Sequence, residues 1–527
     1  MEELKIILFL CNWGPHTAYH ALQDNGYQIP PEIKMVRIPC TGRITKALLF
    51  KAFEMGADGV TLVGCKPGTC RYGSGTENAM SNTEDTRDII GLLGLSKNRM
   101  RFATFLPDEL EALRTFLENF CNDIKQLGPS SIKPSADSQA PTTTGKTLKE
   151  IVAAHEVYAC QDCGKCTSSC PLALSGKPYS PRSIASSIMT GDVDAERVRK
   201  DIYACLTCGV CYERCPSQVN FPQFICDVRC SMDQEEIGRH QAHGGFFQSL
   251  MRSMTSAELK PNKWSWLPKG ISVDSKSKKL FFGGCAPYFD VFFRKHHGIQ
   301  TSEILVDSLR LLNFFDITPA LLENERCCGH DLLWSGDEKN FLKLARLNVD
   351  SLHDLGVEEV ITSCPECYRT LAYDYPKYGI KIGFKLTHIY EFLENEIDRG
   401  AVAFHEIEET ITYQDSCRLN HVDSIKHLPR KLIHRLASET FEDMKDSENA
   451  ALCCGNCAWI GCDSFSKALQ VKRLRQAHAT GSHLLVTSCP KCQIHLRCAM
   501  EDPFRHEELM MEMKDLTSII AKHIYWE

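Results

Sequence analysis

The sequence predicts an α/β plus α protein: a small parallel α/β domain at the N-terminus, a helical cysteine domain, and a duplicated α/β region at the C-terminus. Three observations support this prediction. Strand-like and helix-like segments alternate at both ends of the chain. The 28 cysteines gather in short clusters. A five-cysteine pattern occurs twice in the C-terminal half, with nearly the same spacing.

Strand-like and helix-like runs define a first domain over residues 1–127. Gly128-Pro129 ends its last helix, and the Ser-, Thr- and Pro-rich residues 128–147 are typical of a linker. The short apolar runs predicted as strands are Lys5–Cys11, Lys34–Cys40, Gly59–Cys65 and Met100–Leu106. The predicted helices are Thr45–Met55, Thr83–Leu93 and Asp108–Gln126.

In this first domain, cysteines lie at the ends of the predicted strands. Cys11, Cys40 and Cys65 close predicted strands, and Cys70 follows in the next loop. Because parallel strands end at the same edge of a sheet, we expect these thiols to converge there. Four thiolates on one edge suit a [2Fe-2S] cluster or a zinc ion.

Residues 148–260 form the predicted helical domain, with a cysteine motif written twice. The spacing C-x2-C-x2-C-x3-C-P occurs at Cys160, Cys163, Cys166 and Cys170, and again at Cys205, Cys208, Cys211 and Cys215. In such motifs three thiolates cap one cubane and the fourth reaches the other. We therefore predict one [4Fe-4S] cluster on Cys160, Cys163, Cys166 and Cys215, and a second on Cys205, Cys208, Cys211 and Cys170. The long insert, with helix-like Pro181–Met189 and Asp194–Ile202, resembles the helical ferredoxins of respiratory complexes.

The C-terminal repeats span residues 280–400 and 401–527, and the latter ends in a helix-like stretch at Arg505–Ile524. In each repeat a strand-like run, Val360–Ser363 or Leu484–Ser488, leads into a C-x-x-C motif. Ligands at the carboxyl ends of strands suit a crevice in an α/β unit. The first set is Cys285, Cys327, Cys328, Cys364 and Cys367, and the second is Cys417, Cys453, Cys454, Cys489 and Cys492.

This doubled Cys-Cys-Gly pattern resembles the CCG family of heterodisulfide reductases, and its order after a ferredoxin domain resembles the fused D subunit of that family. The resemblance implies that each repeat binds a non-cubane [4Fe-4S] cluster through its five cysteines. It also implies that a disulfide substrate lies between the two clusters. His330 and His421 are candidate proton donors, with a purely structural role as the alternative.

The first domain carries a second resemblance. Cys11-Asn12-Trp13, Cys40-Thr41-Gly42-Arg43 and Gly64-Cys65-Lys66-Pro67-Gly68 look like the delta subunit of the methyl-viologen-reducing hydrogenase. That resemblance implies a [2Fe-2S] cluster on Cys11, Cys40, Cys65 and Cys70. Gly14 stands where the family usually has a further cysteine.

The composition of the chain limits its expected binding partners and cellular location. A net charge of −7 argues against nucleic acid or a polybasic membrane contact. No apolar run approaches the roughly 20 residues of a spanning helix. The start, Met1-Glu2-Glu3-Leu4, lacks signal-peptide features. We therefore expect a cytoplasmic protein whose clustered cysteines bind metal in a reducing environment instead of forming disulfides.

Together these features predict an oxidoreductase chain acting on sulfur groups as part of a complex. Electrons would pass from the [2Fe-2S] domain through two cubanes to the paired non-cubane clusters, which reduce a disulfide. No G-x-G-x-x-G fingerprint for a flavin or nucleotide follows a strand. The expected partners are therefore a flavin-containing protein like the A subunit of heterodisulfide reductase, and a hydrogenase, formate dehydrogenase or other dehydrogenase or reductase.

Two alternatives stand beside this function. A non-catalytic relay in an electron-bifurcating complex, serving acyl-CoA or methyl-carrier reduction, is favoured by the unusual segment from Cys457 to Cys462. A zinc-rich interaction module fits five-ligand sets poorly. The cysteines expected to be small buried apolar residues are Cys121, Cys226, Cys230, Cys457, Cys462 and Cys498.

Overall fold

The computed structural model describes residues 4–134, 146–193, 196–232, 238–295, 297–400 and 402–526. These residues form two compact units, one from Met1–Ala140 with His243–Trp266, the other from Pro141–Ala242 with Leu267–Glu527. Most of the predicted linker, at residues 135–145, lies outside the described residues, as does the start of the helix predicted from Asp194. The mixed α/β plus α class predicted from the sequence is confirmed.

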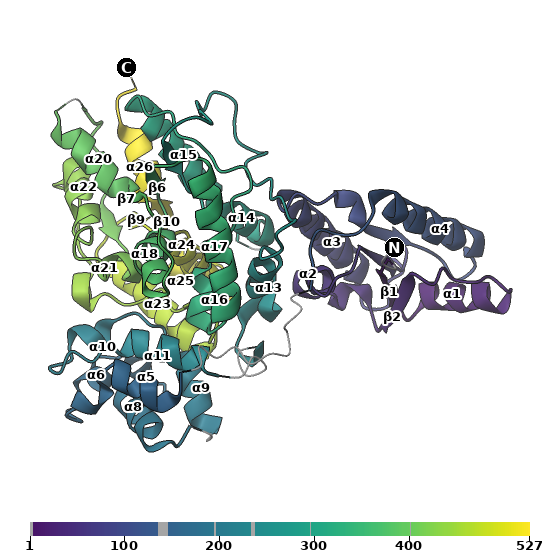
Figure 1. The fold of residues 1–527 in the computed structure, drawn as a ribbon, viewed down its shortest axis with the longest axis horizontal. Helices are drawn as coiled ribbons and strands as arrows, with labels where there is room; N and C mark the ends of the chain where they lie inside the picture. Colours follow the sequence, from purple (N-terminus) through teal and green to yellow (C-terminus); the bar gives the residue numbers. More distant parts are fainter. Residues whose placement is uncertain are drawn as a thin grey trace. The chain divides into compact units, whose positions relative to one another are not determined.

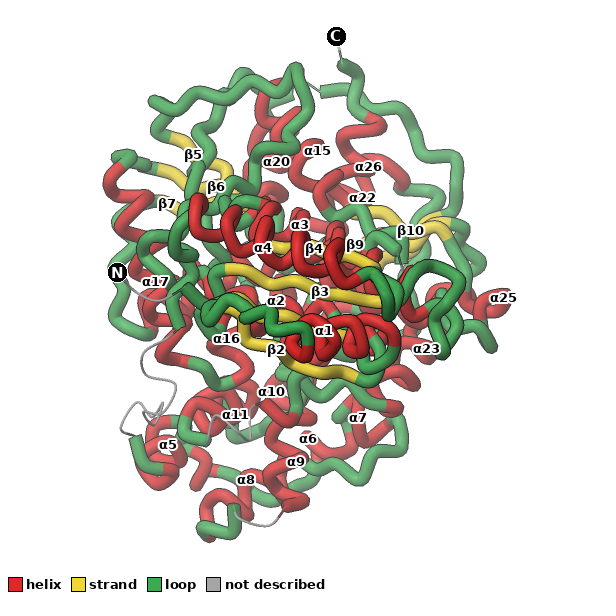
Figure 2. The backbone as a smooth tube through the Cα atoms, turned by 90° about the vertical axis from the view of Figure 1, so that its right-hand side faces the viewer, coloured by secondary structure: helices red, strands yellow, loops and turns green. Residues whose placement is uncertain are grey.

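The first unit is built on a four-stranded parallel sheet in the order β2-β1-β3-β4 (Figure 2). Apolar side chains of β1, such as Ile6 and Leu8, pack with α1 and α4 in one buried core. Helices α2 and α3 pack together. The strands are β1 Ile6–Cys11, β2 Ile33–Ile38, β3 Gly59–Gly64 and β4 Met100–Thr104. The helices are α1 Gly14–Asp24, α2 Lys46–Glu54, α3 Gly75–Leu92 and α4 Leu110–Leu127.

A segment from the middle of the chain completes this first unit. Helix α13, Phe246–Ser253, packs against α2, and Arg252 Nε donates to Glu54 Oε1 at 2.6 Å. Farther along, Asn262 N donates to Leu92 O at 2.8 Å. The sequence pattern predicted one helical domain over residues 148–260, but His243–Trp266 buries its apolar face in the first unit instead.

Short helices make up the ferredoxin region, which Figure 1 shows gathered below the two repeats. Most are one or two turns long, because the chain must reverse at each cysteine loop. They are α5 Leu148–Ala154, α6 Lys165–Ser168, α7 Pro171–Leu174, α8 Pro181–Thr190, α9 Glu196–Ala204, α10 Val210–Glu213 and α11 Phe221–Cys230.

Each C-terminal repeat is a three-stranded parallel sheet covered by helices. The central strand in each, β6 or β9, leads into the C-x-x-C motif. The first repeat has β5 Lys279–Phe281, β6 Glu359–Thr362 and β7 Lys385–His388 with α14 Ala286–Phe293, α15 Ser302–Phe314, α16 His330–Ser335, α17 Glu338–Asp354, α18 Pro365–Arg369, α19 Tyr375–Lys377 and α20 Ile389–Asp398. The second has β8 Ile411–Tyr413, β9 Leu484–Thr487 and β10 Glu512–Asp515 with α21 Cys417–Asn420, α22 Leu428–Ala437, α23 Ser464–Ala479, α24 Pro490–Met500, α25 His506–Leu509 and α26 Leu516–His523.

The helix predicted over Arg505–Ile524 is wrong in its middle. Strand β10 lies there between α25 and α26, and it pairs in parallel with β9 from Glu512 to Asp515. Its four residues are too few to show an alternating pattern in the sequence, and the pairing with β9 determines their conformation.

A buried histidine ends the third strand of the first repeat. His388 is fully buried and caps helix α20, where its Nδ1 accepts a hydrogen bond from Tyr390 N at 3.3 Å. Its Nε2 has no hydrogen-bond partner among the described residues. Burial lowers the pKa of His388 to about 3, so the ring is neutral at pH 7.

We expect this histidine to make the first repeat less stable in mild acid. In the unfolded chain His388 is protonated below about pH 6.5, whereas in the folded chain it stays neutral down to about pH 3. The free energy of unfolding therefore falls as the pH falls through 6.5. Between roughly pH 7 and pH 5.5 the loss is about 1 kcal/mol. Hydrogen exchange of β6 and β7 amides, corrected for intrinsic rates, measures it. His388→Asn keeps a capping oxygen and lacks this loss; equal pH slopes in both proteins would contradict the expectation.

Candidate metal-cluster sites

The four cysteines of the first domain come together at one edge of its sheet. Cys11 ends β1, while Cys40 and Cys65 follow shortly after β2 and β3. The Sγ atoms of Cys11 and Cys65 lie 3.6 Å apart, and those of Cys40 and Cys70 lie 3.8 Å apart. The structure therefore gathers all four predicted thiols into two touching pairs.

Backbone N–H groups point at these thiols from the starts of helices. Gly14 at the start of α1 donates to Cys65, and Gly75 at the start of α3 donates to Cys70. A Cβ on Gly75 would lie 2.6 Å from Cys40 Sγ, so only glycine fits there. Burial and the neighbouring Cys11 raise the pKa of Cys65 to about 12. Such mutually repelling thiols, supplied with N–H donors, fit a soft metal cluster.

The ferredoxin cysteines group as the exchanged motif predicts. Cys170 lines one cavity with Cys205, Cys208 and Cys211. Burial raises the pKa of Cys166, and the charges of Cys160 and Cys215 add to the effect, which places those three together. Cys163 is exposed. Each predicted set thus gains a thiol from the other motif.

The five thiols of each C-terminal repeat interact in the same order in both repeats. The cysteine that comes first in the sequence contacts the first cysteine of the Cys-Cys pair. The second cysteine of that pair contacts the second cysteine of the C-x-x-C motif, which in turn contacts the first cysteine of the same motif. In the first repeat the order is Cys285, Cys327, Cys328, Cys367, Cys364. In the second it is Cys417, Cys453, Cys454, Cys492, Cys489.

The surroundings of the two sets differ. All five thiols of the first repeat line one cavity, to which Pro490 and Lys491 of the second repeat contribute. Cys417 and Cys453 of the second repeat line another cavity together with Cys208 of the ferredoxin region. Cys364 and Pro490, the residue that follows Cys489, line the same cavity, so the two repeat sets also adjoin. The second repeat therefore contacts both the second ferredoxin set and the first repeat. The first repeat also contacts the ferredoxin region directly, where Arg229 Nη1 donates to Trp334 O at 2.8 Å.

Comparisons with known proteins match the same three regions of the chain. Residues 6–128 match the methyl-viologen-reducing hydrogenase delta-subunit family, residues 159–220 match a 4Fe-4S dicluster domain, and residues 280–372 and 411–497 match the cysteine-rich CCG domain. The D subunit of the dihydromethanophenazine:CoB–CoM heterodisulfide reductase of Methanosarcina barkeri is 26% identical over 378 residues, which is 65% of this chain and 88% of that protein. The first domain of this chain belongs to the hydrogenase delta-subunit family, and the rest of the chain is similar to the heterodisulfide reductase D subunit.

Two further relatives match this D-subunit-like chain, one over a quarter of its length and the other over most of it. The F420-non-reducing hydrogenase vhc iron-sulfur D subunit of Methanococcus voltae is 33% identical over 131 residues, 25% of this chain and 91% of that protein. The B subunit of the fumarate reductase (CoM/CoB) of Methanothermobacter marburgensis is 24% identical over 420 residues, 78% of each chain. The chain is thus an iron-sulfur protein related to these oxidoreductase components. Among its described residues, no helix is long and apolar enough to cross a membrane.

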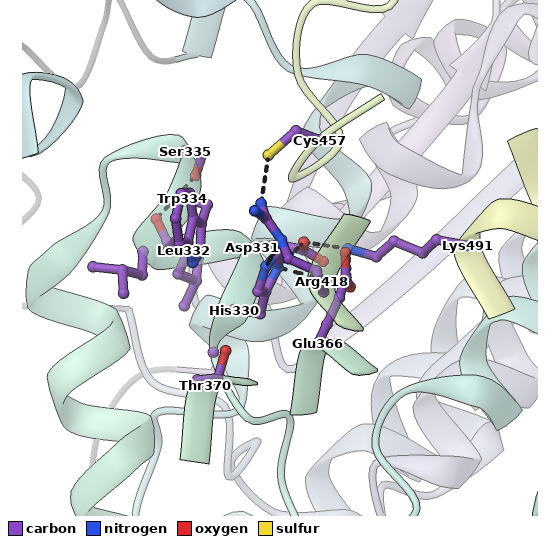
Figure 3. Close-up of polar contacts among 12 residues, drawn as sticks. His330, Asp331, Leu332, Trp334, Ser335, Glu366, Thr370, Arg418, Cys457 and Lys491 are labelled. Carbon is purple, nitrogen blue, oxygen red and sulfur yellow. Dashed lines mark hydrogen bonds and ion pairs between the residues drawn. The ribbon is translucent and has the colours of Figure 1, made fainter. Parts of the chain in front are cut away.

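A buried polar network joins the two repeats of the D-subunit-like chain (Figure 3). Lys491 of the second repeat forms ion pairs with Asp331 and with Glu366, at 2.6 Å for Glu366 Oε2. His330 Nδ1 donates to Asp331 Oδ1 at 3.0 Å, and Arg418 Nε donates to His330 Nε2 at 3.0 Å. His330 is therefore neutral, with its proton on Nδ1. Lys491 also fills the space between His330, Asp331 and Glu366, which would otherwise suit a cation.

Sequence reasoning found only His330 of this network. The missed signal lies in the C-x-x-C motifs, which run Cys-Pro-Glu-Cys in the first repeat and Cys-Pro-Lys-Cys in the second. Glu366 and Lys491 hold equivalent positions with opposite charge, and they pair across the repeats. Opposite charges at equivalent positions of the two repeats predict a contact between the repeats, and this signal can be read from the sequence alone.

The other predicted proton donor lies elsewhere. His421 faces the ferredoxin loop, where its Nε2 donates to Cys208 O at 2.8 Å. Burial, with the charge of Arg418, lowers the pKa of His421 to about 4. Its ring is therefore neutral at pH 7, and its ring N–H is engaged with a carbonyl outside the cavity of the first repeat.

The remaining cysteines divide into two groups. Cys121, Cys226, Cys230 and Cys457 are buried, as expected for small apolar residues. Cys462 is exposed and Cys498 half-buried, so the expectation of burial is wrong for these two. Cys462 lies in the loop just before Asp463 caps helix α23, and Cys498 faces Lys467, whose Nζ lies 3.1 Å from its sulfur.

We expect the network to behave as one charged unit. Lys491→Gln leaves Asp331 and Glu366 buried without a cation and should lower the free energy of unfolding by about 3 kcal/mol. Glu366→Gln in the same chain should recover at least about 1 kcal/mol of that loss. Urea unfolding followed by tryptophan fluorescence measures both, because Lys491 Nζ lies 5.4 Å from the Trp459 ring centroid.

The exposed pair of Arg399 with Glu396 provides the control for this cycle. Arg399→Gln should change stability little, because solvent screens such pairs. Additive losses for the single and double variants at Glu366 and Lys491 would show that the network is not coupled.

Proposed function

We propose that this chain is the electron-transferring and catalytic component of a heterodisulfide-reductase-like complex, and that it reduces a disulfide at the paired C-terminal sites. The observation that carries the proposal is the complete, equivalent set of five contacting thiols in each repeat, with the two sets adjoining. A single set would serve storage or relay of one electron. Two adjoining sets suit a reaction that consumes two.

The thiol sets suit five clusters. The first domain would hold a [2Fe-2S] cluster on Cys11, Cys40, Cys65 and Cys70. The ferredoxin region would hold two cubane [4Fe-4S] clusters, and the repeats two non-cubane [4Fe-4S] clusters. When bound, these groups supply one-electron transfer at low potential and soft iron sites that accept thiolate sulfur. Iron is favoured over zinc in the repeats, since five contacting thiols exceed the four that tetrahedral zinc takes.

The chain's own residues shape the first-repeat cavity for this reaction. Cleavage of a disulfide takes two electrons and two protons and yields two thiols. Lys491 and His330 both line the cavity and carry N–H protons beside it. Asp331 and Glu366 raise the pKa of Lys491 well above its ordinary value, so that it stays charged and orients the wall of the cavity. We propose that His330 and Lys491 hold the protons that the reaction needs in this cavity, and that His421 contacts the ferredoxin loop.

Electrons must reach the chain from another protein, because its sequence has no flavin or nucleotide fingerprint. A flavin-containing partner like the A subunit of heterodisulfide reductase is proposed, together with a hydrogenase, formate dehydrogenase or similar dehydrogenase or reductase. The match of the first domain to an iron-sulfur component of a hydrogenase supports this assembly.

A second candidate function is an electron relay that hands electrons to another reductase. One observation favours it. Trp459 is fully buried between the repeats and stacks on Phe293, and with the charged network it fills part of the space where a substrate would lie. The two functions share every cluster and differ in whether the chain itself releases thiols from a disulfide.

Iron content and thiol release together test the proposal. Anaerobically purified protein should contain roughly 18 iron atoms per chain. Cys328→Ala should lose roughly four of them, because it opens the first-repeat set. Wild type reduced with dithionite should release thiols from an added disulfide, and Cys328→Ala should release none. Thiols are quantified by a chromogenic reagent after removal of the dithionite.

Cys498→Ser is the matched control, since Cys498 belongs to no thiol set. It should keep the iron content and thiol release of the wild type. If the wild type has its full iron content but releases no thiols, the proposed disulfide reduction is contradicted and the electron-relay function is favoured.

A further inference from the structure

The two cysteine loops of the ferredoxin region share an unusual backbone conformation. Their sequences are Cys160-Gln161-Asp162-Cys163 and Cys205-Leu206-Thr207-Cys208. The third residue of each has positive φ, 51° for Asp162 and 48° for Thr207. Aspartate tolerates this left-handed region, but a β-branched threonine is strained in it. The second loop therefore needs more outside support than the first.

An arginine supports the first loop from within the ferredoxin region. Arg182, in α8, donates from Nη1 to the Asp162 carbonyl at 2.9 Å. The same Nη1 lies 3.2 Å from Asp162 Oδ1. One guanidinium thus holds both the backbone and the side chain of the residue with positive φ, and this contact is on the surface.

An arginine also supports the second loop, but it comes from a different domain. Arg418 of the second C-terminal repeat donates from Nη1 to the Thr207 carbonyl at 3.0 Å. Its Nη2 donates to Thr207 Oγ1 at 2.9 Å. The contact has the same two parts as that of Arg182, yet Arg418 is only 2% exposed. Within the ferredoxin region, Arg229 of α11 donates from Nη2 to the Cys205 carbonyl at 2.7 Å, at the start of the second loop. The residue with positive φ, Thr207, is held by Arg418 of the repeat.

A second residue beside α21 extends the contact. His421 donates to the carbonyl of Cys208, the next residue of the loop. It lies so close that a Cβ on Gly209 would come within 1.6 Å of the ring. Glycine after Cys208 therefore allows the second repeat to approach the loop. The helix that begins with the ligand Cys417 and the residue after it thus contact three successive residues of the ferredoxin loop.

Arg418 also reaches the other repeat. Its Nε donates to His330 Nε2 at 3.0 Å, and its guanidinium lies 4.1 Å from the Trp334 ring centroid, both in α16 of the first repeat. Its Nη2 lies 3.3 Å from Cys457 Sγ within the second repeat. Figure 3 shows Arg418 between His330 and Cys457. With its contacts to Thr207, this one buried cation joins the ferredoxin loop to both repeats.

We propose that Arg418 is a positioning residue for the second ferredoxin cluster: it replaces, from the second repeat, the support that Arg182 gives the first loop. Arg229 holds the start of the loop of Cys205, Cys208 and Cys211 from its own region, and Arg418 holds the strained Thr207 from the repeat. The cluster on this loop and the site on Cys417 are thereby built as one structure, with a fixed positive charge between them. This inference rests on the proposed cluster ligation and is independent of disulfide reduction.

Redox titration of the two cubanes by electron paramagnetic resonance tests the proposal in the full chain. Arg418→Gln removes a positive charge beside one cubane and should lower the midpoint potential of that cubane alone. Arg182→Gln should act on the other cubane signal. Arg418→Lys keeps the charge but loses the two-part contact, so the potential should return toward that of the wild type. In both Arg418 variants, electron transfer from the cubane to the repeat sites, measured by rapid-freeze quenching, should be slower than in the wild type.

Arg473→Lys is the control for a buried arginine in the same repeat. Arg473 is fully buried, and its donors go to Gln414, Asp446 and Gln476 of that repeat. Both cubane signals should match the wild type in this variant. Cubane potentials and transfer rate unchanged in Arg418→Gln would overturn the proposal, as would equal shifts of both cubanes in Arg418→Gln and Arg473→Lys.

Thr207→Val covers the case in which Arg418→Gln does not fold. It removes the hydroxyl that contacts both Arg418 Nη2 and Cys457 Sγ, keeps the carbonyl that Arg418 Nη1 contacts, and should give a smaller shift of the same cubane. No shift in this variant would also overturn the proposal. Because none of these measurements uses a disulfide, failure of the proposed reaction would leave them unaffected.

Discussion

Holding thiolates in contact is the constraint on which the whole structure depends, because like charges repel strongly where little water screens them. Burial raises the pKa of Cys208 to about 12, with the charge of Cys205 adding to the effect. The chain opposes this repulsion in two ways. In the first domain, N–H groups at helix starts point at the sulfurs. Between the repeats, the buried cations Arg418 and Lys491 lie beside the sets, so an incoming soft metal completes the charge balance.

The differences between the repeats explain why they pair with each other. The residue inside the C-x-x-C is Glu366 in one and Lys491 in the other. Two copies of either repeat, paired in the same way, would bury like charges against each other, at a cost of several kcal/mol. The residue after the first ligand differs as well, alanine at 286 and arginine at 418. The ligand order is therefore duplicated, while the surface between the repeats is complementary.

The sequence predicted the ligand positions well because metal sites impose local spacing. Cys11 and Cys65 lie at the ends of strands in a parallel sheet, so their meeting follows from the topology alone. The failures are non-local. Arg252 meets Glu54 of α2 although they lie 198 positions apart in the chain, and no local pattern marks that contact. Strand β10 forms because β9 is present to pair with it. His421 looked like a proton donor from its distance to Cys417, but the ferredoxin loop fixes its ring.

The unusual Cys457 segment is explained by the same contacts. Cys457 is buried and its sulfur lies 3.0 Å from Thr207 Oγ1 and 3.3 Å from Arg418 Nη2. It is thus an acceptor at the junction and belongs to no thiol set of its repeat. The junction brings the second repeat to the ferredoxin loop, although the first repeat comes earlier in the sequence. The first repeat meets the ferredoxin region at α11, where Arg229 Nη1 donates to Trp334 O at 2.8 Å. Within the connection from the ferredoxin region to the first repeat, the segment His243–Trp266 belongs to the other unit.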